Sequence, residues 1–172
     1  MTHRLTEPSF SPMNIPGLLL FVHILGFVLW LGVTFTLAAF TVKAAKSENR
    51  DVVAFTYRTA CHLLKGPGLI GMILTLGSGV WLTVALGYSF FQPFPNHWLF
   101  QMQFLGTIAF LVALFYQIPL ADRLARAAEA SAAAGESSAA FLKFRKRNGM
   151  VGSILGLLLL INLVLGAVRP GG

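Results

Sequence analysis

The feature that most constrains the fold is the length of the uncharged stretches. Three of them contain no Asp, Glu, Lys or Arg: residues 8–42, 66–121 and 148–168. Only 11% of the chain is charged, whereas a soluble domain carries about a quarter. The middle stretch is too long for one spanning helix, which needs about 20 mainly apolar residues, and the polar segment 92–96 divides it. The sequence therefore predicts an integral membrane protein with four spans, at about residues 16–42, 69–87, 98–118 and 150–168.

The four spans predict an all-α membrane protein with a single domain over residues 1–172. Short turns make successive helices antiparallel neighbours, so we expect an up-down-up-down four-helix bundle. Each of the two basic connections is expected to hold a short helix. The first begins within residues 47–51, which offer three candidate N-caps, and ends at the Gly-Pro-Gly run 66–68. The second continues the third span, with a kink at Pro119 and a stop at Gly135.

Basic residues gather on one side of the expected bundle. Eleven of the thirteen follow the first and third spans. They are Lys43, Lys46, Arg50, Arg58, Lys65, Arg123, Arg126, Lys143, Arg145, Lys146 and Arg147. By the positive-inside rule, these connections face the cytoplasm, and both termini lie outside a bacterial-type inner membrane. The same placement favours contact with anionic lipid over nucleic acid, which we do not expect as a partner. The N-terminal segment 1–14 does not resemble a cleaved signal peptide.

Polar residues of three spans fall at one expected depth. Because a helix rises about 1.5 Å per residue, His23 in the first span lies level with Gln103 in the third and Asn162 in the fourth. Met102 and Trp81 lie close to the same level. Polar groups inside a membrane usually face the bundle interior and mark functional sites. His23 has two interpretations: it fixes helix register by a hydrogen bond to Gln103 or Asn162, or it ligates haem iron.

Several kinds of chemistry find no support in the sequence. No span interior carries a charged side chain, which disfavours a proton relay or a charge-lined ion pathway. No phosphate-binding loop or hydrolase motif is present. The lone Cys61 excludes an internal disulfide and paired-cysteine metal motifs.

Four stretches together resemble a known group of membrane proteins. FVHILGFVLWLGVTF, residues 21–35, is similar to the first-span pattern L-H-x-x-x-x-x-x-W-x-G of CopD-like proteins and HemJ-type protoporphyrinogen oxidases. The other three resemble later spans of the HemJ type. They are YRTACHLLKGPGLIGMILTLGSGVWL, HWLFQMQFLGTIAF and FRKRNGMVGSILGLLLLINLVLGAVRP.

The resemblance implies a tetraspan protein that binds haem b, with His23 as an axial ligand of the iron. Met102 stands on or beside the family's third-span lysine, and we consider it as the second metal ligand. Trp30 and Trp81 would pack on the macrocycle, while Gln103 and Asn162 would tune it. The glutamate that normally follows the fourth-span asparagine is Gly149 here.

Two functions are therefore expected. The first is a haem b protein that carries out electron transfer or porphyrin oxidation near the outer leaflet. The second is an accessory or scaffold subunit without catalytic activity, in which the polar residues hold helices together. Its partners would be the lipid bilayer and either other subunits of a membrane complex or a second copy in a homodimer.

Overall fold

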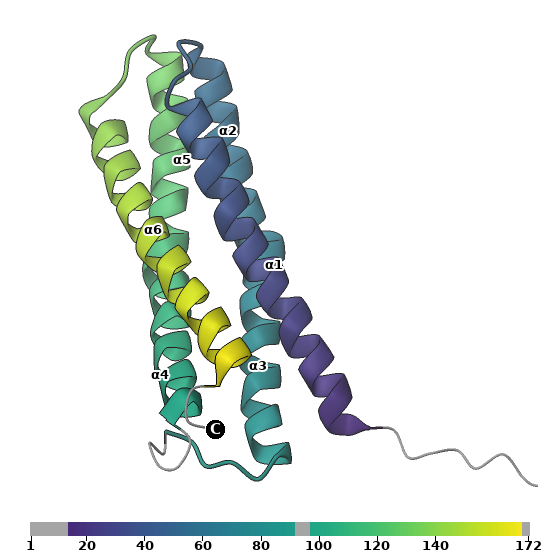
Figure 1. Ribbon diagram of the computed structural model, residues 1–172. Helices are drawn as coiled ribbons and strands as arrows, with labels where there is room; N and C mark the ends of the chain where they lie inside the picture. Colours follow the sequence, from purple (N-terminus) through teal and green to yellow (C-terminus); the bar gives the residue numbers. More distant parts are fainter. Residues whose placement is uncertain (1–13, 92–96, 170–172) are drawn as a thin grey trace, which may run out of the picture.

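The computed structural model describes residues 14–91 and 97–169, which form helices joined by short turns. In chain order the α-helices are α1 (Ile15–Ala44), α2 (Arg50–Leu63), α3 (Leu69–Ala85), α4 (His97–Val112), α5 (Ile118–Ala133) and α6 (Ala139–Val168). Two π-helical segments, η1 (Leu64–Gly68) and η2 (Ala113–Gln117), join α2 to α3 and α4 to α5. The result is four long helices that run up and down beside one another (Figure 1), each apolar enough to cross a membrane. The all-α fold with four spans is confirmed.

The π segments correct one expected helix boundary. The first connecting helix does not end at residues 66–68, because the chain runs through them as one helix from Arg50 to Ala85. A π turn shifts the backbone hydrogen-bond register by one residue, which accommodates Pro67, a residue without an N–H group. Segment η2 ends two residues before Pro119 and carries the helix past that proline in the same way. The third span therefore continues into its basic connection, as expected.

The molecule has two chemically different ends. At the basic end, the α1–α2 turn lies beside the α5–α6 turn (Figure 1), and the Arg50 guanidinium donates to Ser137 Oγ at 2.9 Å. Asn49 caps α2 there by accepting from the backbone N–H groups of Asp51 and Val52. Gly135, with φ +70°, follows the end of α5 as expected. The terminal end holds the start of α1, the end of α6 and the turn after α3 (Figure 1).

Buried apolar side chains form two clusters. The bilayer core lies within the spans and consists of Trp30, Leu64, Met72, Ala109, Ala113, Val151, Leu155 and Leu159. The basic-end core lies between α2, α5 and the start of α6, and consists of Ala54, Tyr57, Leu124, Ala128 and Phe141. Tyr57 and Phe141 meet there edge to face, with ring centroids 5.6 Å apart. Many large apolar side chains elsewhere on the spans are exposed, as a lipid-facing surface requires.

Helices α1 and α3 approach closely through glycines. A Cβ atom added to Gly26 would lie 2.7 Å from the backbone nitrogen of Thr75, and one added to Gly71 would lie 2.7 Å from that of Trp30. Each helix therefore presents a bare stretch of backbone to the other, which is how small residues let membrane helices pack. We call this the α1–α3 glycine contact. Gly77, in contrast, has no neighbouring atom within 4 Å.

Candidate functional site

His23 lies on the face of α1 that packs against α3. Its Nδ1 atom is 2.9 Å from the backbone oxygen of Thr75 and 3.3 Å from Ser78 Oγ. Gly79 makes this approach possible, since a Cβ atom there would lie only 3.0 Å from Cε1 of the imidazole. The half-buried ring is thus positioned by α3, one helical turn from the α1–α3 glycine contact.

The hydrogen bonds fix the tautomer of this histidine. A carbonyl oxygen only accepts, so Nδ1 of His23 must carry the proton and donate to Thr75. Ser78 agrees with this assignment, because its own hydroxyl donates to the backbone oxygen of Leu74. In the neutral ring, Nε2 is then unprotonated, and its lone pair points away from the Thr75 carbonyl. Metal-bound histidines typically show this arrangement, with the second nitrogen donating to a carbonyl or carboxylate.

The expected hydrogen bond from His23 to Gln103 or Asn162 is wrong. Gln103 instead accepts from the backbone N–H of Phe91 at 2.7 Å, and its amide group donates to Thr83 Oγ1 at 3.4 Å. Asn162 is buried and donates to the backbone oxygen of Leu158 in its own helix. The depth comparison identified polar residues at one level of the spans but could not show which partner each of them has.

The remaining predicted site residues lie in different surroundings. Trp30 is buried in the bilayer core, two helical turns from His23 toward the basic end. Trp81 is 65% exposed and stands two residues after Gly79, on the opposite side of α3 from His23. Met102 is half-buried and packs against α6, with its Cε atom 3.2 Å from the position of a Gly166 Cβ. Their roles toward a haem group stay predictions.

A second group of polar residues, which the sequence reasoning missed, surrounds a cavity in the basic-end half of the spans. Gln117 is 8% exposed, and its Nε2 atom donates to Asn148 Oδ1 at 3.1 Å. Its Oε1 atom is buried and has no hydrogen-bond partner among the described residues. The sequence signal was a single amide between aromatic and apolar residues just before Pro119. Thr75 was missed as the partner of His23 because a backbone acceptor leaves no mark in a sequence.

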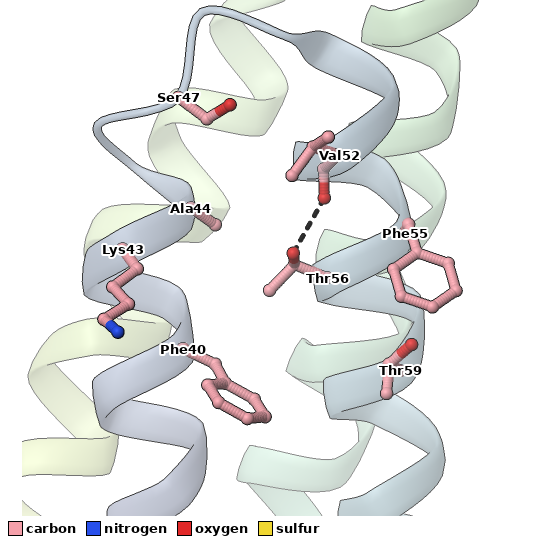
Figure 2. A pocket seen from close by; sticks show the side chains of 8 residues that line it. All are labelled: Phe40, Lys43, Ala44, Ser47, Val52, Phe55, Thr56 and Thr59. Carbon is pink, nitrogen blue, oxygen red and sulfur yellow. Dashed lines mark hydrogen bonds between the residues drawn. The ribbon is translucent and has the colours of Figure 1, made fainter.

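A cleft of about 290 Å³ lies between the end of α1 and the start of α2. Figure 2 shows its lining, with Phe40 and Lys43 on α1 and Phe55 on α2. The Thr56 hydroxyl donates to the backbone oxygen of Val52 at 2.7 Å and so offers its proton to no ligand. Both phenyl rings are about half exposed, which suits the headgroup region of a bilayer better than a ligand site.

Ion pairs tie α2 to α5 at the basic end. Asp122 accepts from both Lys65 and Arg126, and the expected helical-turn pairing of Asp122 with Arg126 is confirmed. Arg58 and Glu129 form a looser pair at 3.7 Å. These side chains are partly exposed, so the pairs fix the register of two helices and do not form a buried charged site.

The fold and its uncharged interior define a multi-pass membrane protein. Residues 17–170 match the family described as "Predicted integral membrane protein (DUF2269)", and the chain belongs to this family. Comparisons with curated proteins and with solved structures found no match. Membership confirms the membrane protein expected from the sequence. The finer resemblance to CopD-like and HemJ-type proteins stays a prediction.

Proposed function

We propose that this protein binds haem b in the terminal half of the bundle, and that Nε2 of His23 would hold the iron. The observation that carries the proposal is the hydrogen bond from Nδ1 of His23 to the Thr75 carbonyl. This bond leaves Nε2 unprotonated and holds the ring at a set angle. It also resembles the orientation of proximal histidines in haem proteins, where the outer hydrogen bond tunes the iron.

The described residues would present one histidine nitrogen to the iron. Thr75 and Ser78 orient the donor, and Gly79 gives the ring its place against α3. Met102, which packs against Gly166, would be the second residue to hold the iron. Bound haem b would supply reversible one-electron chemistry for electron transfer or porphyrin oxidation.

An optical spectrum of the protein purified in mild detergent tests the proposal. We expect a Soret band that shifts on reduction with dithionite and is lost in His23→Ala. His62→Ala is the matched control, because His62 is an exposed histidine of α2. A protein without a Soret band, or one in which both variants keep it equally, would contradict the proposal.

A second pair of variants separates ligation from folding. Gly79→Ala pushes on the His23 ring, whereas Gly77→Ala meets no atom within 4 Å. We expect the first to shift the reduced spectrum and the second to leave it unchanged. Identical spectra would show that the position of His23 against α3 does not matter to the haem.

An accessory subunit is the second candidate function. The observation in its favour is that the same His23–Thr75 hydrogen bond, together with the α1–α3 glycine contact, suffices to hold two helices in register. Copurification distinguishes the two functions. A subunit brings stoichiometric partner chains with it in mild detergent, while a chain that runs alone or as a homodimer with bound haem excludes this role.

We also propose that the basic end faces the cytoplasm of a bacterial-type inner membrane, because the basic connections meet there. Single cysteines introduced on a background without Cys61 test the orientation. Ser137→Cys at the basic end should resist an impermeant thiol reagent in intact cells, and Tyr88→Cys at the terminal end should react. The reverse labelling pattern would overturn this orientation.

A further inference from the structure

Gln117, the last residue of η2, has a buried acceptor atom in its side-chain amide. Gln117 is more than nine-tenths buried, and its Oε1 atom has no hydrogen-bond partner in the described part of the chain. Leaving such a group unsatisfied costs about as much as a strong hydrogen bond contributes, and the cost is higher where no water competes. Buried polar groups of this kind point to a missing partner.

Gln117 lies in the wall of a cavity of about 140 Å³ between α1, α2, α6 and the helix that contains η2. This volume is close to that of an engineered cavity that holds a single benzene ring. The lining residues include Trp30, Tyr57, Asn148 and several hydroxyl-bearing side chains, and none of them is charged or a histidine. A ligand of this cavity is therefore small and neutral, with a hydrogen-bond donor for Gln117.

Both π segments contribute to the lining. Leu64 opens η1, Ala113 opens η2, and Gln117 closes η2; all three face this cavity. A π turn adds one residue to the helix and rotates everything after it by about 100° relative to a regular helix. Such turns are frequent at functional sites. Here η2 places an amide among apolar residues where a regular helix would have turned it elsewhere.

The way into the cavity passes between α1 and α6. Ala38 and Val42 on one side, and Gly149 and Ser153 on the other, line the cavity and are also exposed. These residues lie where the spans meet the basic end, close to the expected headgroup level. A molecule dissolved in the membrane can reach the amide from the side, through a gap bordered mostly by small residues.

From these observations we propose that the cavity binds one neutral, ring-sized molecule that carries a hydroxyl group and arrives from the lipid phase. Phenols and the headgroups of quinols belong to this class. The hydroxyl donates to Oε1 of Gln117, and the ring lies among the apolar lining near Trp30. Hydroxyl oxygens also accept, and two lining residues, Trp30 and Tyr57, carry an N–H and an O–H group that can donate. The proposal does not depend on haem binding at His23.

The test compares two probes that differ only in the donor. 3,5-Dimethylphenol carries a hydroxyl, and 3,5-dimethylanisole has the same ring with the proton replaced by a methyl group. Calorimetric titration of the full chain in detergent, corrected with empty micelles, measures each affinity. We expect one saturable phenol site per chain and affinity for the anisole about tenfold weaker, the effect of one buried hydrogen bond.

Variants connect the affinity to the cavity. Gln117→Leu should weaken phenol binding about tenfold and remove the difference between the probes. Gln101→Leu, at an exposed glutamine outside the cavity, should change neither affinity. Gly152 faces the Gln117 amide, with its Cβ position 3.8 Å from Nε2, so Gly152→Leu should block both probes and provides the test if Gln117→Leu does not fold. Equal affinities for the probes, no effect of Gln117→Leu, or no saturable binding would each overturn the proposal and leave a cavity that holds only water.

Discussion

The two halves of the bundle are packed differently around α1. In the terminal half, α1 and α3 bring bare backbone together at Gly26 and Gly71, and no room is left between them. In the basic-end half, α1 and α6 stand apart around a cavity whose wall contains an unsatisfied amide. The first arrangement fixes a side chain, His23, in one orientation. The second leaves space that another molecule can fill.

This difference shows where a membrane bundle can bind ligands. Helices in lipid gain little from the hydrophobic effect and depend on close packing and on hydrogen bonds. The α1–α3 glycine contact supplies that packing in one place, which allows the helices to separate elsewhere.

Gly26→Ala should destabilise the α1–α3 glycine contact in the terminal half. The new Cβ atom would lie 2.7 Å from the backbone nitrogen of Thr75, and backbone cannot move aside as a flexible side chain can. We expect a loss of about 2 to 3 kcal/mol in the free energy of unfolding, the upper part of the range for overpacking. Titration with SDS measures it. Gly32→Ala has no atom within 4 Å, so it should be neutral or slightly stabilising, and an equal loss in both variants would contradict the packing argument.

Gln117→Leu should stabilise the half that contains the cavity, which is the opposite of the effect expected for Gly26→Ala. Without a ligand, the substitution removes a buried acceptor that has no partner and gives up one hydrogen bond to Asn148. The first effect is the larger, so we expect the free energy of unfolding to rise by about 1 kcal/mol. The same SDS titration, carried out on phenol-free protein, checks the sign. A clear loss of stability would mean that Oε1 is already satisfied in the purified protein.

Glu129→Gln should have the smallest effect, because its ion pair takes part in neither the α1–α3 glycine contact nor the cavity. Arg58 and Glu129 are 3.7 Å apart and about half exposed, and such pairs contribute about 0.2 to 1 kcal/mol. We expect a difference of this size at low salt that disappears at high salt. Thermal unfolding at two salt concentrations measures it. A loss above 1 kcal/mol would show that the basic end is more tightly coupled to the bundle than its exposure indicates.

Sequence reasoning recovered the fold because charge and apolar length alone determine how many helices cross a membrane. It also identified His23 as an interior residue, the stop at Gly135 and the pairing of Asp122 with Arg126. The site was recovered less well. The partners of His23 are a backbone carbonyl and Ser78, and the carbonyl is accessible only because Gly79 lacks a side chain.

The π segments explain the other errors. A proline after a glycine normally indicates the end of a helix. The local sequence does not show whether the helix will instead form one π turn and continue. That choice depends on packing partners far away in the sequence. Because η2 changes which face Gln117 presents, counting residues along a regular helix could not have placed this amide in the cavity.

The length of the two central helices has a further consequence. Residues 50–85 and 97–133 form helices of 36 and 37 residues, each about 54 Å long at 1.5 Å per residue, whereas the hydrocarbon layer is only about 30 Å thick. We therefore expect the basic-end core to lie outside the hydrocarbon layer, in contact with water, and the bilayer core to lie within the layer. Apolar burial from water weakens on cooling and in urea, while packing between helices in lipid does not depend on that force. Urea should therefore unfold the packing of Tyr57, Leu124 and Phe141 at a lower concentration than the packing of Met72. The two cores of this chain would then differ in stability because water surrounds one and lipid surrounds the other.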